Sequence, residues 1–276
     1  MKKNYLGKTL LLVLVLSLLV VSSSINSKIE AKDEKVITFA AANLKLYEDT
    51  TKILADEVKK LGYTLKYKFL SDNTQLNEAV ENKEIFANYH QHIAYLQEFN
   101  KVHHTHLGIA FEVFTDRAGL FSKKYKDISK LPDGANISIP VDPGNNFRTF
   151  IILADAGLIK LKPGVNLASV TKKDIIENPH KFKFTEVDYT FLSRAIEDAD
   201  AGFLYATVAA EIGLDYNKDA LLKERKDLQS PDIIAVRTEN VNSPKAKILK
   251  KAYQTERLKK ALKEAYGGTE VLLPAW

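Results

Sequence analysis

The sequence of 276 residues lacks cysteine entirely and contains a single methionine and a single tryptophan. The lack of cysteine excludes disulfide bonds, a thiol nucleophile and a covalent lipid on an N-terminal cysteine. The stability of the folded chain must therefore come from a buried core. A composition of 45% hydrophobic residues is enough to build one.

Known catalytic patterns are also missing. No serine occupies a G-x-S-x-G elbow, and no glycine-rich phosphate loop is present. Acidic residues are plentiful but scattered, which is typical of solvated helix faces. A nucleophile, a base and an oxyanion donor cannot be assembled from these residues, so the sequence predicts a protein that is not an enzyme and that needs no cofactor.

The net charge of +5 is concentrated at the start of the chain. In the first 31 residues, lysines at positions 2, 3, 8 and 28 are balanced only by Glu30, which leaves 36 basic and 34 acidic residues from Lys32 onward. No basic patch remains that would favour nucleic acid as a partner.

The N-terminus has the order of a secretory signal peptide. Three lysines accompany a nearly pure Leu/Val segment, Thr9 to Val21, which is followed by three serines at positions 22–24. That segment is shorter than the roughly 20 residues that cross a bilayer. We therefore expect a signal peptide over residues 1–31, cleaved after Ser24 or Ala31, with an uncleaved membrane anchor as the alternative.

Beyond Lys32 the pattern alternates between strands and helices. A buried strand over residues 36–41 precedes a helix that places Leu54 and Val58 on one face and ends at Gly62. Residues 63–69 alternate between apolar and polar side chains, as a half-buried strand does. Further helices near 76–80 and 92–99, and strands near 85–89 and 107–114, predict right-handed βαβ units around a mixed sheet.

A second set of elements begins after Gly119. It comprises a strand over 137–141, the loop 142–146, a helix to Ala156, strands over 181–187 and 201–204, and a helix over 189–197. Thr171 and Asp174 resemble a capping pair for another helix. A strand over 233–237 leads back to the first part, and Ser243 followed by proline opens the C-terminal helices.

These patterns predict an α/β protein of two lobes. The chain would cross between them near residues 112–120 and 228–240, so that one lobe comprises residues 32–115 and 233–276 and the other comprises residues 116–232. Ligands of open α/β sheets bind at the carboxyl ends of the strands. The expected ligand cleft therefore lies between the lobes.

Three segments lie at predicted strand ends, at residues 88–92, 142–148 and 204–207. The second is the most informative, because a loop that opens a helix offers unpaired N–H groups and the positive end of the helix dipole to an anion. Arg148, expected in the first turn of that helix, can grip a carboxylate with its guanidinium group. The alternative is a surface ion pair for Arg148 and a plain N-cap for Asn145.

Five of the six histidines fall between residues 90 and 106, at positions 90, 92, 103, 104 and 106. A His-x-His pair places two imidazoles on one face of a strand, where they can bind a metal. No acidic residue has a matching spacing, and the second group is expected in an exposed loop. A solvated or hydrogen-bonded cluster is therefore favoured over a metal site.

Several segments in order resemble the NlpA-type substrate-binding proteins, the methionine-binding receptors of ABC importers. Residues 88–96 read NYHQHIAYL and are similar to the family segment N-[YF]-F-Q-H-x-P-Y-L. Residues 131–135 match L-P-D-G-A, and residues 142–148 match D-P-T-N-x-x-R. Further matches at 156–161, 174–179, 266–268 and 274–276 extend the resemblance over essentially the whole mature chain.

The resemblance implies a two-lobed periplasmic-binding-protein fold, similar to type II, that closes on one amino acid. It implies that Arg148 holds the ligand carboxylate with Asn145 nearby. Tyr89, His92 and Tyr95 would then form part of the wall that the other lobe contributes.

The sequence departs from the family pattern at four further candidate ligand-binding positions. His90 replaces an aromatic residue, Tyr205 and Thr207 replace the two asparagines of an I-N-G-N-Y-A segment, and Arg117 enters an E-P-M-G crossing. These changes make the expected pocket more aromatic and more polar, and buried polar groups need partners. We therefore expect an amino acid or derivative with an extra polar or acidic group in place of methionine itself.

The expected function is that of an extracytoplasmic receptor that captures a small amino acid, methionine-like or a more polar relative, as a monomer, and delivers it to a membrane ABC permease. The family usually carries a lipid on a cysteine directly after its signal, where this chain has Ser22 to Ser24. The sequence therefore predicts a periplasmic protein that is not a conventional lipoprotein. The alternatives are a surface adhesin on the same scaffold and a metal-binding receptor that uses the histidine cluster.

Overall fold

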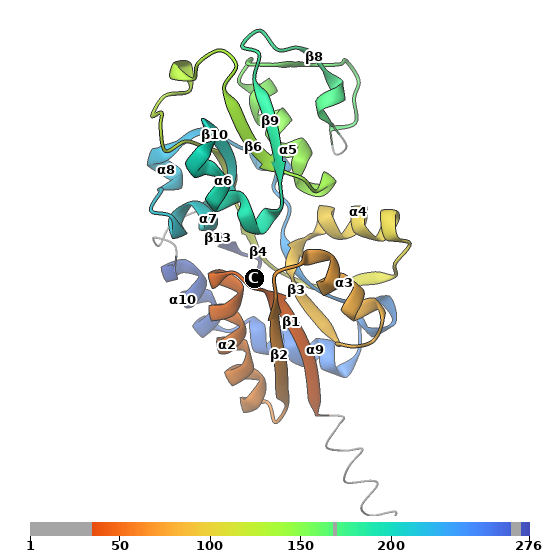
Figure 1. Cartoon of the computed structure of the whole chain (residues 1–276). Coiled ribbons are helices and arrows are strands. Elements are labelled where there is room, and N and C mark those ends of the chain that lie inside the picture. Colours follow the sequence, from red (N-terminus) through yellow and green to blue (C-terminus); the bar gives the residue numbers. More distant parts are fainter. Residues whose placement is uncertain (1–34, 168–169, 266–271) are drawn as a thin grey trace, which may run out of the picture.

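The computed structural model describes residues 35–167, 170–265 and 272–276. It consists of two α/β lobes, one above the other in Figure 1. The predicted signal peptide, both expected cleavage sites and the family match at 266–268 lie outside the described residues. No helix in the described part is both long enough and apolar enough to span a membrane.

The first lobe is built on a six-stranded sheet. Its strands are, in spatial order, β13 (Leu272–Pro274), β4 (Leu107–Asp116), β12 (Asp232–Arg237), β3 (Ala87–His92), β1 (Val36–Ala42) and β2 (Thr64–Leu70). Strand β1 pairs in parallel with β2 and β3, whereas β12 runs antiparallel to β3 and β4. Its helices are α2 (Lys45–Lys60), α3 (Asn73–Glu81), α4 (Ile93–His103), α9 (Pro244–Tyr253) and α10 (Glu256–Ala265).

The second lobe is built on a five-stranded sheet. Its strands are, in spatial order, β11 (Ala220–Lys223), β5 (Ala118–Phe121), β10 (Ala201–Tyr205), β6 (Asn136–Pro140) and β9 (Lys183–Val187). Strands β7 (Lys160–Leu161) and β8 (Ile175–Glu177) form a separate pair. Its helices are α5 (Pro143–Asp155), α6 (Leu192–Asp198), α7 (Ala206–Glu211) and α8 (Tyr216–Asp219).

Short 3-10 turns connect these elements. They are η1 (Ile128–Lys130), η3 (Lys172–Asp174), η4 (Tyr189–Phe191), η5 (Lys226–Leu228) and η6 (Thr238–Asn240).

The chain passes between the two sheets twice. Strand β4 ends at Asp116 and β5 begins at Ala118, so the outward crossing is a single residue; the return lies between η5 and Asp232, the first residue of β12. Each sheet has its own cluster of buried apolar side chains. The division into residues 32–115, 116–232 and 233–276 stays a prediction.

The apolar period of α2 explains how this helix packs. Leu54 and Val58 are fully buried against the first sheet, whereas Lys59 and Lys60 lie in the last turn, where cations stabilise the helix dipole. Gly62 follows in the left-handed region with φ +79°, which glycine adopts at little cost. The predicted end of this helix therefore agrees with the structure.

Three local features differ from the sequence expectation. Helix α5 begins at Pro143, because proline favours the first helical position, and this places Arg148 in the second turn. Thr171 and Asp174 form a capping box, but the box closes only the 3-10 turn η3, which continues into β8. Strand β3 runs on to His92, because β12 pairs with it along its length, and all six of its residues are buried.

Candidate functional site

A small cavity lies between the two lobes, at the ends of β3, β4 and β10. The residues that line it are Tyr47, Asn73, His90, Gln91, His92, Tyr95, Asp116, Asn145, Tyr189, Tyr205 and Asp232. Its volume is about 20 Å³, which is about what one buried water molecule occupies. In this conformation the inner cavity therefore has no room for an amino acid.

A larger outer cleft, of about 430 Å³, adjoins this cavity. The two share Asn73 from α3, Tyr95 from α4 and Tyr189 from η4. Tyr95 belongs to the first lobe and Tyr189 to the second, so the passage from the cleft to the cavity runs between residues of opposite lobes. Separation of the lobes would widen it.

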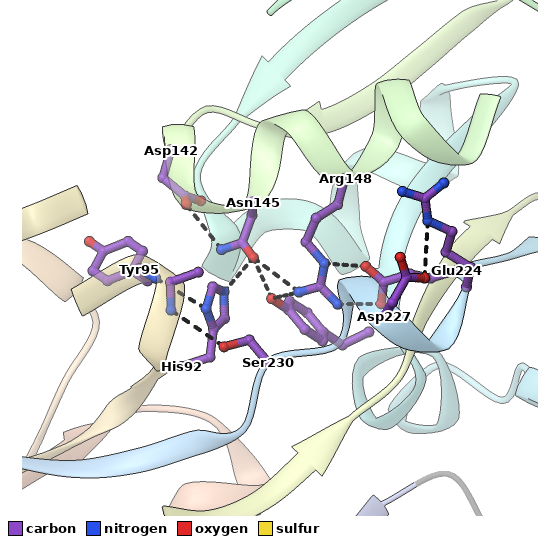
Figure 2. A network of polar contacts seen from close by, with 11 residues as sticks. His92, Tyr95, Asp142, Asn145, Arg148, Glu224, Asp227 and Ser230 are labelled. Carbon is purple, nitrogen blue, oxygen red and sulfur yellow. Dashed lines mark hydrogen bonds and ion pairs between the residues drawn. The ribbon is translucent and has the colours of Figure 1, made fainter. Parts of the chain in front are cut away.

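His92 connects the first lobe to the second. It is the N-cap residue of α4, where its Nδ1 accepts a hydrogen bond from the N–H of Tyr95 at 3.1 Å. Its Nε2 therefore carries the hydrogen and donates to Oδ1 of Asn145 at 2.7 Å, as Figure 2 shows. Burial lowers the pKa of His92 to about 3, with a further contribution from the nearby charge of Arg148.

Asn145, in the first turn of α5, is the centre of the network in Figure 2. Its Oδ1 accepts from the Tyr205 hydroxyl at 2.5 Å and from Arg148 Nη1 at 3.3 Å, in addition to His92. Its Nδ2 donates to Asp142 Oδ1 at 3.0 Å. Burial raises the pKa of Asp142 to about 6.

Arg148 forms a buried ion pair with Glu224. Its Nε and Nη2 donate to the two carboxylate oxygens of Glu224 at 2.5 and 2.6 Å, and the two side chains are 3% and 0% exposed. Its Nη1 donates to the hydroxyl of Tyr205 at 2.6 Å, and its guanidinium carbon lies 4.9 Å from the centre of that ring. Burial alone would lower the pKa of Arg148, but Tyr205 and Glu224 raise it above its ordinary value.

Glu224 carries no recognisable signal in the sequence. It lies in the charged run KERKD, which is typical of a solvated surface. Strand β11 adds antiparallel to β5, and the N–H of Glu224 donates to the carbonyl of Ala118 at 3.0 Å. This long-range pairing buries the Glu224 carboxylate beside Arg148.

The structure brings five of the nine predicted ligand-binding residues to the cavity. These are His90, His92, Tyr95, Asn145 and Tyr205. The other four lie around it without lining it, and they are Tyr89, Arg117, Arg148 and Thr207.

The four outer residues occupy distinct places. Tyr89 is fully buried in the core of the first lobe, where its hydroxyl lies 2.7 Å from that of Tyr253. Thr207, at the start of α7, donates its hydroxyl to Asp116. Arg117 is the crossing residue, and its carbonyl accepts from the N–H of Ala206 at 2.7 Å. Arg148 does not line the cavity, but it donates to the hydroxyl of Tyr205, which does.

Two cavity residues that the sequence analysis did not select are buried carboxyl groups. Asp232 accepts from the Tyr47 hydroxyl at 2.7 Å, and burial raises its pKa to about 7. Burial also raises the pKa of Asp116 well above its ordinary value. Asp116 Oδ2 accepts from Thr207, whereas its Oδ1 is buried with no hydrogen-bond partner.

The histidines do not gather into one cluster. His90 lies beside Asn77, at 3.2 Å from Nε2 to Oδ1, and burial lowers its pKa to about 3. His103 stacks on Phe99 at the end of α4, and His106 lies 3.3 Å from Glu81 on the surface. Within residues 35–167, 170–265 and 272–276, no three histidine or acidic side chains are grouped as metal ligands.

Comparisons with known proteins all point to one class of protein. The family model for NlpA lipoprotein matches residues 37–276. A relative named "Methionine-binding lipoprotein MetQ" from Bacillus subtilis is 34% identical over 272 residues, which cover 97% of each chain. Another, named "Probable D-methionine-binding lipoprotein MetQ" from Haemophilus influenzae, is 37% identical over 82% of this chain and 86% of its own.

A solved structure supports the same class. It is a nutrient-binding protein from Burkholderia cenocepacia bound to methionine, 30% identical to this chain, with a TM-score of 0.81 over 87% of this chain and all of that one (100%). The two-lobed α/β fold with a cavity between the lobes is that of a substrate-binding protein, a class of non-enzymatic receptors. The chain belongs to the NlpA lipoprotein family.

These comparisons confirm the predicted fold class and family, and they correct the predicted localisation. An extracytoplasmic location is consistent with the relatives, but the description "not a conventional lipoprotein" is wrong, because the family model and the relatives are all named lipoproteins. The prediction was based on one missing residue type near Ser22 to Ser24. The family match covers residues 37–276 and therefore both lobes.

Proposed function

We propose that the chain is the receptor of an ABC importer and that it binds one amino acid between its lobes. The observation that carries the proposal is the network from His92 through Asn145 and Tyr205 to Arg148, because it joins both lobes at the cavity. The names of the relatives add support for methionine or D-methionine as ligand.

The ligand carboxylate would approach the second lobe. Arg148 supplies the positive charge there, but Glu224 holds two of its nitrogens. The hydroxyl of Tyr205 and the amide of Asn145 stand between the guanidinium group and the cavity. In this proposal Arg148 positions these two groups and favours an anion beside them.

The ligand can enter only if the lobes separate. Gly144, in α5, packs so closely on α4 that a Cβ there would lie 3.0 Å from the Cα of Tyr95. Tyr95, which lines both the cavity and the outer cleft, therefore lies directly against α5 of the second lobe. A hinge motion at the two crossings would open the passage from the outer cleft, and a ligand that binds both walls would favour the closed state.

The remaining parts of the proposal concern assembly and activity. The receptor works as a monomer without catalysis, and it passes its ligand to a membrane permease. Analytical ultracentrifugation of the purified protein with and without methionine tests the monomer, which should sediment as one species of about 31 kDa or less. A stable dimer would contradict that part alone.

Calorimetric titration with L-methionine, D-methionine, glutamine and glutamate tests the ligand class. We expect at least one of these amino acids to bind to the wild-type protein. The Tyr205→Phe variant, which keeps the ring, should bind more weakly by about tenfold, since it loses a hydroxyl bonded to Asn145 and Arg148. The matched control Tyr125→Phe lies outside the cavity and should bind as the wild type does. Failure of every amino acid to bind would refute the proposal.

A further inference from the structure

We propose that the outer side of helix α9 is a binding surface for an anionic lipid membrane. Its centre is formed by Lys247, Lys250 and Lys251, and we call these three residues the α9 basic face. This surface lies outside the ligand cavity, so the proposal goes beyond the proposed function. It would hold the receptor against a bilayer whose headgroups carry negative charge.

Charge is distributed unevenly along the chain. From Lys32 onward the chain has 36 basic and 34 acidic residues. The segment 244–264, which comprises α9 and most of α10, has eight basic residues but only two acidic ones, Glu256 and Glu264. This segment carries a net charge of +6, whereas the other residues from Lys32 onward, 28 basic and 32 acidic, carry −4. The near-neutral total therefore conceals a basic segment of the kind that binds anionic lipids.

Helix α9 has a buried side and a charged side. Leu249 and Ala252 are buried in the core of the first lobe. Lys247, Lys250 and Lys251 are exposed. Because residues three and four positions apart are neighbours on the surface of a helix, the three ammonium groups extend from one side of α9. A flat anionic surface can therefore contact all three at once.

The charges of the α9 basic face are not compensated within the part of the chain that the structure describes. There, the ion pairs of α9 and α10 involve Arg257 and Lys260 on the basic side, and the three lysines of the α9 basic face have no carboxylate partner. Exposed lysines of the second lobe differ, since Lys160 lies 2.7 Å from Glu177. Uncompensated charge of one sign creates a potential that attracts an oppositely charged partner.

Helix α9 begins at the end of the first sheet that is opposite the cavity. His92, which lines the cavity, is the last residue of β3. Phe86 directly precedes the same strand, and the ammonium group of Lys245, in the first turn of α9, lies 6.0 Å from the centre of its ring. In Figure 1, α9 accordingly lies in the lower part of the first lobe, away from the second lobe. A membrane bound there would not cover the cavity.

The polypeptide enters the first lobe at this same end, which favours a membrane over other anionic partners. The N–H of Phe86 donates to the carbonyl of Thr38 at 3.0 Å, close to Lys35, where the described residues begin. The apolar segment Thr9 to Val21 precedes this point in the sequence, and the family is one of lipoproteins. A single acyl chain binds a membrane weakly, and a basic surface is one of the second contacts that make the attachment stable.

Vesicle binding tests the proposal. The purified full chain is titrated with vesicles of phosphatidylglycerol and phosphatidylcholine in equal parts, and with vesicles of phosphatidylcholine alone. We expect at least tenfold tighter binding to the anionic vesicles. The difference should shrink as salt is added, because exposed charges are screened. Equal binding to both kinds of vesicle would overturn the proposal.

A triple variant locates the surface. Lys247→Gln, Lys250→Gln and Lys251→Gln together should weaken binding to the anionic vesicles by about a hundredfold, because each lysine near an anionic surface contributes about a factor of five. Binding to phosphatidylcholine alone should not change. The full chain is used in every case, so that the N-terminal residues contribute equally to all the proteins compared.

A second triple variant is the matched control. Lys160→Gln, Lys162→Gln and Lys172→Gln remove the same charge from second-lobe side chains that are 60%, 51% and 53% exposed. This control should bind the anionic vesicles no more than about threefold more weakly than the wild type, because only its net charge differs. Thermal melting shows whether each variant folds.

The outcomes decide both the place and the partner. Loss of binding in the α9 variant but not in the control supports the membrane surface. Equal weakening of the two variants would show that net charge alone matters, and it would overturn the assignment to α9, as would an α9 variant that folds and binds like the wild type. Wild-type protein that binds soluble polyglutamate but not the anionic vesicles would indicate an acidic protein as partner and would overturn the membrane.

Discussion

The two walls of the cavity differ in how completely their polar groups are satisfied. In the second lobe, Arg148, Glu224, Tyr205 and Asn145 bond to one another in a closed network. In the first lobe, Asp116 and His90 retain acceptor atoms without donors. The second-lobe wall is therefore a preorganised frame, whereas the first-lobe wall lacks the donors that a ligand can bring.

The largest effect on stability should come from removing Arg148 from the second-lobe network. Arg148→Met leaves the Glu224 carboxylate buried without its partner, and we expect the free energy of unfolding to fall by about 3–5 kcal/mol. Urea denaturation measures it. Arg225→Met is the control, because its ion pair with Asp155 is on the surface, and it should cost about 1 kcal/mol or less.

The double variant Arg148→Met/Glu224→Met sharpens this result. Removing both charges leaves no buried ion without a partner, so the double variant should be more stable than Arg148→Met alone. If the double variant is less stable by the sum of the two single changes, the network is not the closed unit described above.

The two cavity histidines should make the protein sensitive to acid. Burial lowers the pKa of both His90 and His92 to about 3, so below pH 6.5 only the unfolded state takes up these protons. The free energy of unfolding should therefore fall as the pH drops from about 6.5 to about 3. At pH 4 the expected loss is about 3 kcal/mol for each imidazole.

The variants His90→Gln and His92→Gln check this sensitivity. Each should flatten the pH dependence of urea denaturation between pH 4 and pH 6.5, whereas His103→Gln, at the exposed end of α4, should leave it unchanged. An unchanged slope in the first two variants would show that these imidazoles are not held neutral.

Asp232 should give the free energy of unfolding the opposite dependence on pH. Its pKa is raised to about 7 in the folded state, so between about pH 4 and pH 7 the folded state holds a proton that the unfolded state has lost. This contribution is fully present below the unfolded pKa and is lost as the pH rises through about 7. Asp232→Asn should remove it, and a stability profile identical to that of the wild type would count against a protonated Asp232.

The smallest effect on stability should come from changing the contact between Gly144 and Tyr95. Gly144→Ala places a Cβ 3.0 Å from the Cα of Tyr95, which α4 can relieve by moving away. We expect a change in stability of about 1 kcal/mol or less, because alanine also favours the helix. Small-angle scattering should show a larger radius of gyration than for the wild type, and an equal radius would show that this contact does not control closure.

The sequence was most informative where chemistry and local pattern coincide. The apolar period predicts α2, and the segments at 88–92 and 142–148 contain His92 and Asn145, whose side chains are hydrogen-bonded in the structure. Tyr89 shares the first segment but turns into the core, because the register of β3 against β1 and β12 decides which side chains face the cavity. A local pattern does not contain that register.

Long-range pairing explains the residues that the sequence did not reveal. Glu224 depends on β11 joining β5, and Asp116 meets Asp232 only because β4 and β12 are neighbours although 116 positions separate the two residues. In the sequence alone, Asp116 and Asp232 both resemble surface residues. Their burial follows from the sheet order, which periodicity cannot predict.

Mass spectrometry of the small molecule that mild denaturation releases from the purified wild-type protein shows directly what the cavity binds. A receptor that closes between these walls should retain an amino acid or a related amine, and the same molecule should be depleted from Asp116→Asn prepared in parallel. A retained acid without an amino group, present equally in both proteins, would contradict the account.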